Sequence, residues 1–174
     1  MPKIRGVLIV LALLAIDLGI APEVASAEAP RAAIVDGAAV LQQSPVEIEA
    51  SLGQPVRSRA VPPGDFRLPA GGTWRVYRGR GLQIDVDFER ERSTTVMIEF
   101  PDRAIAPRTY EAALEAVNLP SSPAPDLVTR DSREWHNLQG YFVRVIAAYP
   151  RLDRIDAIIL SVVPFPAVGG TRTQ

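Results

Sequence analysis

The clearest pattern along the chain is an alternation of apolar and polar residues. Between positions 82 and 88 every second side chain is apolar, and the alternation resumes over 94–100 after a polar turn at 90–93. Because neighbouring side chains of a strand point to opposite faces, this pattern predicts an antiparallel hairpin with one buried and one solvent-exposed face. The exposed face would carry four polar residues, Gln83, Asp85, Asp87 and Glu89.

A second hairpin is predicted over 141–163, with its turn at 150–154. Its return strand is apolar at almost every position over 157–163. A strand of that kind is expected to be covered on both faces. We therefore expect the second hairpin to lie centrally in the fold, or beneath a helix or a partner.

Two short helices are predicted from the signals at their ends. Residues 44–47, Ser-Pro-Val-Glu, form a capping box with proline at the first helical position, and Gly53 with Pro55 ends the helix. The second helix is predicted over 110–117, with Thr109 as its cap, and it stops at an Asn-Leu-Pro sequence.

These elements occur in the same order twice along the chain. Each helix leads through a loop rich in Pro, Gly or Ser to a tryptophan, followed five residues later by a glycine that opens a hairpin. These steps are Trp74 to Gly79 and Trp135 to Gly140. The order suggests an internal duplication. The predicted fold class is therefore α+β, with two tandem helix-plus-antiparallel-hairpin repeats, 44–101 and 109–164, packed together.

The first repeat also resembles a known architecture. The helix and stop of residues 44–55, followed by a strand containing Tyr77 and the alternating strand 82–88, resembles the tandem helix-plus-meander fold of the β-lactamase inhibitor proteins. It is similar as well to the single-unit fold of the small lipoprotein of the outer-membrane β-barrel assembly machine, and to stretches of exported bacterial proteins without an assigned function. The resemblance implies a fold and carries no functional residue.

The N-terminal residues have the composition of an export signal. Lys3 and Arg5 precede an unbroken apolar run over 7–16, and Ala-Ser-Ala at 25–27 supplies the small residues of a cleavage site. Such a run is too short for the roughly 30 Å hydrocarbon core of a bilayer. The alternative is an uncleaved anchor that also uses 18–21. The predicted organisation is a signal peptide (1–27), a lead segment (28–43), the two repeats and a flexible tail (165–174).

Composition narrows the chemistry of the protein. Cleavage would leave 147 of the 174 residues. The net charge of the chain is −1, so its overall electrostatic field does not attract it to nucleic acid or to an anionic membrane. The chain has no cysteine, so it has no disulfide, no thiolate site and no acceptor for a lipid. Lys3 and His136 are the only lysine and histidine. A lysine Schiff base in the exported chain and a site of several imidazoles are therefore excluded.

The polar row of the first hairpin is the sharpest chemical candidate. Asp85, Asp87 and Glu89 would project from one face at a spacing of about 7 Å, which fits paired carboxylates of a glycosidase or oxygen ligands of calcium. The alternative is a solvated strand face balanced by neighbouring arginines. A hydrolase triad of Asp131, Ser132 and His136 is the weaker candidate, because no nucleophile elbow surrounds the serine.

The aromatic residues admit two interpretations. Trp74 and Trp135 are expected in the core, since large aromatic side chains are costly to expose. Alternatively they lie exposed on the sheet as partner contacts, together with Tyr77, Tyr141 and Arg144.

The function expected from the sequence is that of an exported, non-enzymatic protein-binding module, inhibitor-like or envelope-associated. We expect no catalytic residue, cofactor or metal, no nucleic-acid partner and no stable membrane insertion after signal cleavage. The expected partner is another envelope or secreted protein, and the expected location is the periplasm or the exterior. Its candidate contacts are Trp135, Tyr141, Arg144, Asp85, Asp87 and Glu89. The alternative function is a carbohydrate-active or calcium-dependent protein that uses the carboxylate row.

Overall fold

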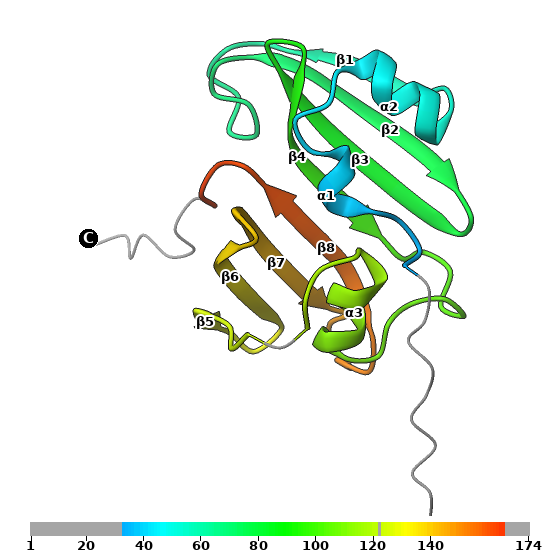
Figure 1. Cartoon of the computed structure of the whole chain (residues 1–174), viewed down its shortest axis with the longest axis vertical. Coiled ribbons are helices and arrows are strands. Elements are labelled where there is room, and N and C mark those ends of the chain that lie inside the picture. Colours follow the sequence, from blue (N-terminus) through cyan, green and yellow to red (C-terminus); the bar gives the residue numbers. More distant parts are fainter. Residues whose placement is uncertain (1–32, 122, 166–174) are drawn as a thin grey trace, which may run out of the picture.

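The computed structural model describes residues 33–121 and 123–165 (Figure 1). The predicted signal peptide, the beginning of the lead segment and all but the first residue of the predicted tail lie outside these residues. Eight strands form one antiparallel sheet in the order β1-β2-β3-β4-β8-β7-β6-β5. Their bounds are β1 Arg57–Val61, β2 Gly72–Gly79, β3 Leu82–Glu89, β4 Arg92–Glu99, β5 Leu127–Val128, β6 Ser132–Leu138, β7 Tyr141–Ala147 and β8 Ile155–Ser161.

The described helices are short: the two predicted ones begin where expected, and one more, within the lead segment, was not predicted. Helix α1 is Gly37–Val40, α2 is Pro45–Leu52 and α3 is Tyr110–Ala116. The predicted capping box of α2 is confirmed, since the Ser44 hydroxyl accepts the backbone N–H of Glu47 while the Glu47 carboxylate accepts that of Ser44. Thr109 caps α3 in the same way through the N–H of Ala112.

The predicted α+β arrangement of two helix-plus-hairpin repeats is wrong, because the described chain is mostly β and forms a single sheet. Both predicted hairpins exist, as β3–β4 and β7–β8. However, the second strand of each hairpin, β4 and β8, pairs with the other in the middle of the sheet. This pairing satisfies backbone N–H and C=O groups that would be unpaired at the edge of two separate hairpins. The tryptophan-bearing segments are strands β2 and β6, and β1 and β5 extend the two edges.

The hydrophobic core lies between the helices and one face of the sheet. All described helices lie on that face in Figure 1, with α2 over β2 and β3 and α3 beside β7 and β8. The core cluster joins Ile48 of α2 and Leu114 of α3 to Ile84, Val96 and Leu160 of the sheet. Strand β8 is central, as expected for its apolar sequence. We call the opposite face of the sheet the open face.

The residues of the open face follow from the strand register. Trp74 of β2 pairs with Asp87 of β3, and Asp85 pairs with Met97 of β4. Met97 in turn pairs with Ile159 of β8, and the row continues across β7 to β6. Since directly paired residues point to the same face, these side chains form one continuous surface.

No helix within residues 33–121 and 123–165 is long and apolar enough to cross a membrane.

Candidate functional site

A groove crosses the open face where the two halves of the sheet meet. Its cavity volume is about 490 Å³. Met97 of β4 and Ile159 of β8 form its floor, and Asp87, Thr95 and Ser161 supply polar groups. Its two walls are the loop 62–71, which joins β1 to β2, and the segment that follows β8. The wall residues are Phe66, Arg67, Pro69, Val163, Pro164 and Phe165.

The loop 62–71 is held against the sheet by its own contacts. Leu68 is its buried anchor, with 2% of its surface exposed. The N–H of Gly64 donates to the carbonyl of Pro69 at 2.9 Å, and Asp65 accepts the N–H of Arg67 at 2.9 Å. Between these contacts the Phe66 side chain is 88% exposed and stands at the rim of the groove.

Asp85 and Asp87 are buried on this face, which corrects the expectation of a solvated row. Their exposed fractions are 5% and 4%. Asp85 accepts the indole N–H of Trp74 at 3.3 Å, and Asp87 accepts a bond from Arg67 at 3.3 Å. The alternation alone could not show this burial, because Arg67 belongs to a loop that is distant in sequence and folds back over the strand.

Burial also changes the acidity of these groups. Loss of water raises the pKa of Asp85, against the opposing effects of Trp74, Arg67, Gln83 and Arg78. The pKa of Asp87 is raised by burial as well, with Asp85 and Asp65 adding to the rise and Arg67 opposing it. On β4, the pKa of Glu99 is raised by burial and by the charges of Asp85 and Asp156. The open face therefore concentrates carboxyl groups whose ionised form is costly.

Glu89, the third member of the predicted row, stands apart from the other two. The β3–β4 register shifts between Asp87 and Phe88, so Glu89 pairs with Arg92 beyond the bulge and is half-buried. Among the described residues no group of three His, Cys, Asp or Glu side chains is arranged to hold a metal ion.

The two tryptophans occupy different faces. Trp135 is 5% exposed, belongs to the core cluster and donates its indole N–H to the carbonyl of Pro123 at 2.9 Å. The expectation of a core position is confirmed for Trp135, and the alternative that it is an exposed partner contact is wrong. Trp74 is half-buried on the open face, so the core prediction is wrong for it. The reason is register, since Trp74 pairs with Asp87 while Trp135 pairs with the core residue Val143.

Tyr141 and Arg144 also point to opposite faces. Tyr141 packs against the core cluster from the helix side. Arg144 lies on the open face, donates to the buried Glu134 at 2.7 Å and stacks over the Phe165 ring at 4.5 Å. The predicted contacts are therefore not one patch: the structure brings Asp85, Asp87 and Arg144 to the open face and leaves Trp135 and Tyr141 inside. Tyr77, the other aromatic considered, is 1% exposed.

The weaker candidate triad is not assembled. The Ser132 hydroxyl lies 2.7 Å from that of Thr129, and Asp131 accepts a bond from the same threonine. His136 is exposed on the open face, with its Nε2 3.9 Å from Glu134. The imidazole is therefore held by neither the serine nor Asp131.

Sequence reasoning missed the residues that shape the groove. Phe66 and Arg67 lie in a loop rich in Pro and Gly, where no periodic pattern exists. Met97 and Ile159 come from strands that are paired only in the folded chain. No local signal marked them, because a single apolar residue in a loop is common on protein surfaces.

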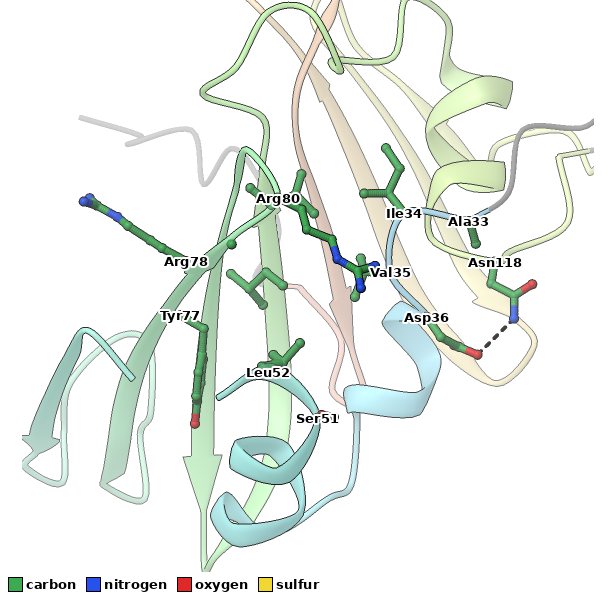
Figure 2. Close-up of a pocket in the computed structure, with 13 residues that line it drawn as sticks. Ala33, Ile34, Val35, Asp36, Ser51, Leu52, Tyr77, Arg78, Arg80 and Asn118 are labelled. Carbon is green, nitrogen blue, oxygen red and sulfur yellow. Dashed lines mark hydrogen bonds between the residues drawn. The ribbon is translucent and has the colours of Figure 1, made fainter. Parts of the chain in front are cut away.

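A second cavity, of about 510 Å³, lies on the helix side between the β2–β3 hairpin and the chain before α1 (Figure 2). Leu52, Tyr77 and Val35 give it an apolar lining, and Asn118 donates to Asp36 at 3.0 Å at its edge. In Figure 2 the Arg78 side chain points away from this cavity. We take the groove on the open face as the candidate site because the exposed Phe66 stands at its rim.

Comparisons with known proteins leave the identity open. No protein-family model and no curated protein matches the chain. Two solved structures are similar at 10% sequence identity and a TM-score of 0.47. One is a cysteine-rich secretory protein from Staphylococcus aureus, matched over 75% of this chain and 48% of its own. The other is an extracellular protein with an SCP domain from Bacillus anthracis, matched over 71% and 44%. The chain thus spans less than half of either structure, and the resemblance to the β-lactamase inhibitor proteins stays a prediction.

Proposed function

We propose that this chain is an exported, non-enzymatic binding protein that holds an extended segment of another exported protein in the groove of its open face. The observation that carries the proposal is the exposed apolar rim of that groove. Phe66 is 88% and Val163 48% exposed, on opposite walls above the apolar floor of Met97 and Ile159. An exposed aromatic side chain of this kind becomes buried when a partner binds, and buried aromatic anchors carry much of the binding energy at protein interfaces.

The lining of the groove supports a binding role. Ligand sites are mostly apolar concavities with a few polar groups that fix orientation, and their volumes run from about 300 to 1,000 Å³. The groove has this size and mixture, with Asp87, Thr95, Ser161 and Arg67 among apolar side chains. A protruding phenylalanine is better covered by the surface of a partner than by a small ligand enclosed in the groove. The export part of the proposal rests on the sequence of residues 1–27.

Site-specific crosslinking in living cells tests this function. A photo-crosslinking amino acid would replace Phe66 in one variant and Val46 in the other. Val46 is the matched control, because it is 76% exposed but lies on α2. We expect one recurrent exported protein to be captured from position 66 and not from position 46. With the purified partner, Phe66→Ser should weaken binding about tenfold or more, while Val46→Ser should not.

Two results would contradict the proposal. One is capture of the same set of proteins from both positions, which would indicate non-specific collisions. The other is undiminished affinity of the Phe66→Ser variant for the captured protein.

A carbohydrate-active protein is the second candidate, favoured by the burial that raises the pKa of Asp85 and Asp87. A raised pKa brings a carboxyl group closer to the range suited to general acid chemistry. Glycan binding that persists after both residues are replaced by Asn, with Glu89→Gln added, would eliminate this candidate.

A further inference from the structure

At one end of the groove, which we call its acidic end, the buried carboxylates outnumber the cations in direct contact with them. Two buried carboxylates, Asp85 and Asp87, lie on neighbouring positions of the open face. Arg67 is paired with Asp87 and has no ion pair or hydrogen bond with Asp85 among the described residues. A buried carboxylate needs a paired charge or several hydrogen bonds to offset the loss of water.

Each of the two carboxylates has one oxygen atom without a hydrogen bond among the described residues. These atoms are Oδ1 of Asp85 and Oδ1 of Asp87, both shielded from solvent. Asp87 lines the groove, and Asp85 lies two positions away on the same face of β3, outside the lining of the groove. The site therefore has unused acceptor capacity next to a space that a ligand can enter.

Arg67 is a loosely held counter-ion. Its Nη2 lies 3.2 Å from Oδ1 of Asp87, without hydrogen-bond geometry, and 3.3 Å from Oδ2. A strong guanidinium–carboxylate bond is shorter, about 2.7–2.9 Å. The Arg67 side chain is 28% exposed and belongs to a surface loop. A partner cation that replaces it would keep Asp87 paired, which is necessary because an unpaired buried carboxylate is costly.

The neighbouring indole completes a surface suited to a guanidinium group. Arg67 lies over the Trp74 ring at 5.5 Å, and Arg59 lies over it at 5.7 Å. The same indole donates its N–H to Asp85. A planar cation that takes the place of Arg67 would lie next to the indole and the Asp87 carboxylate together, which is the combination that favours arginine over lysine.

Resting on the proposed function, we infer that the acidic end of the groove binds an arginine side chain of the partner segment, which displaces Arg67 from Asp87. The partner guanidinium takes the place of Arg67 at Asp87, near the unsatisfied Oδ1 of Asp85, and apolar neighbours of that arginine occupy the floor formed by Met97 and Ile159. Arg67 serves as an internal counter-ion while the groove is empty.

Calorimetric titration with two matched peptides tests this inference. The first is acetylated and amidated Leu-Ala-Arg-Ala-Leu, which places the arginine and both leucines on one side when extended. The second carries citrulline, an uncharged isostere, in place of arginine. We expect the arginine peptide to bind the purified protein about tenfold or more tightly. The difference should disappear in Asp87→Asn.

Replacement of Arg67 distinguishes the proposed competition between two guanidinium groups from a purely structural ion pair. Arg67→Gln should strengthen binding of the arginine peptide, because the competing guanidinium is removed. Arg59→Gln is the matched control, since Arg59 stacks on the same indole and should not change affinity. Equal strengthening by both variants would indicate a general charge effect and would overturn the inference, as would weaker binding in Arg67→Gln.

The peptide pair separates this inference from the function on which it rests. Equal binding of the arginine and citrulline peptides would overturn the arginine site and leave the peptide-binding groove intact. Failure of both peptides to bind would count against the arginine site, while the partner crosslinked from position 66 would still decide the proposed function. Thermal melting of each variant shows that any loss of binding occurs in a folded protein.

Discussion

At the scale of single residues, the burial of two carboxylates on the open face makes folding less favourable, while one of them supplies a polar group to the groove. Asp85 and Asp87 lose almost all contact with water, and their described partners do not satisfy all of their oxygen atoms. Natural proteins retain such groups where their chemistry is used, and a carboxyl group with a raised pKa in a concave site is a candidate for function. The same two residues should therefore link stability to pH.

Asp85→Asn should stabilise the protein at neutral pH. The pKa of Asp85 is raised above its ordinary value of 3.8, so the folded state binds this proton more tightly than the unfolded state does. The free-energy cost of burying the ionised Asp85 carboxylate is absent below about pH 3.8, the ordinary pKa, and is complete once the pH exceeds the folded-state pKa. Denaturation of both proteins at pH 7 and near pH 3.5 measures the difference. An equal gain at the two pH values would contradict this cause.

At the scale of elements, the β2–β3 hairpin depends on one close approach of backbones. A Cβ atom added to Gly72, at the start of β2, would lie 2.0 Å from the carbonyl oxygen of Phe88. That carbonyl belongs to the paired strand, where Thr73 faces Phe88. The glycine is therefore required by packing, without any need for a left-handed backbone.

Gly72→Ala should destabilise the protein by about 2 kcal/mol or more, because relief of the clash must separate β2 from β3. Gly79→Ala is the matched control at the other end of the same strand, where an added Cβ meets no heavy atom within 4 Å. It should change stability by about 0.5 kcal/mol or less. Urea denaturation measures both variants, and a similar free energy of unfolding for the two would refute this packing argument.

At the scale of the whole molecule, stability depends on the pairing of β4 with β8. The register runs from Thr95 opposite Ser161 to Glu99 opposite Ala157, and the fully buried Val96 and Leu160 face each other within it. This seam joins the two halves of the sheet and also forms the floor of the groove. A change at the seam therefore affects folding and binding together.

A fragment of residues 28–101 should not fold cooperatively. It would contain β1 to β4 but would expose the edge of β4 and the apolar side chains that β8 and α3 cover in the complete chain. Circular dichroism during heating should show no sharp transition. Two-state melting of the fragment would show that the first half is an independent unit.

The local sequence was sufficient for elements whose causes are local. The capping box at Ser44 and the stop at Gly53 defined α2, since a cap is an interaction between residues three apart. The alternation over 82–88 defined β3, because its period follows from the geometry of one strand. The long apolar run of β8 correctly indicated a central position in the sheet.

Only the tertiary structure decided the fold class and the candidate site. The pairing of β4 with β8 joins residues 58 to 66 positions apart, and no local pattern specifies it. Asp87 is covered by Arg67 of the loop 62–71, which is twenty positions away in the chain. Sequence by itself determined which segments become helices and strands and which residue types are available. Long-range packing determined which faces meet and which charges lose water, because both depend on contacts between segments that are distant in the chain.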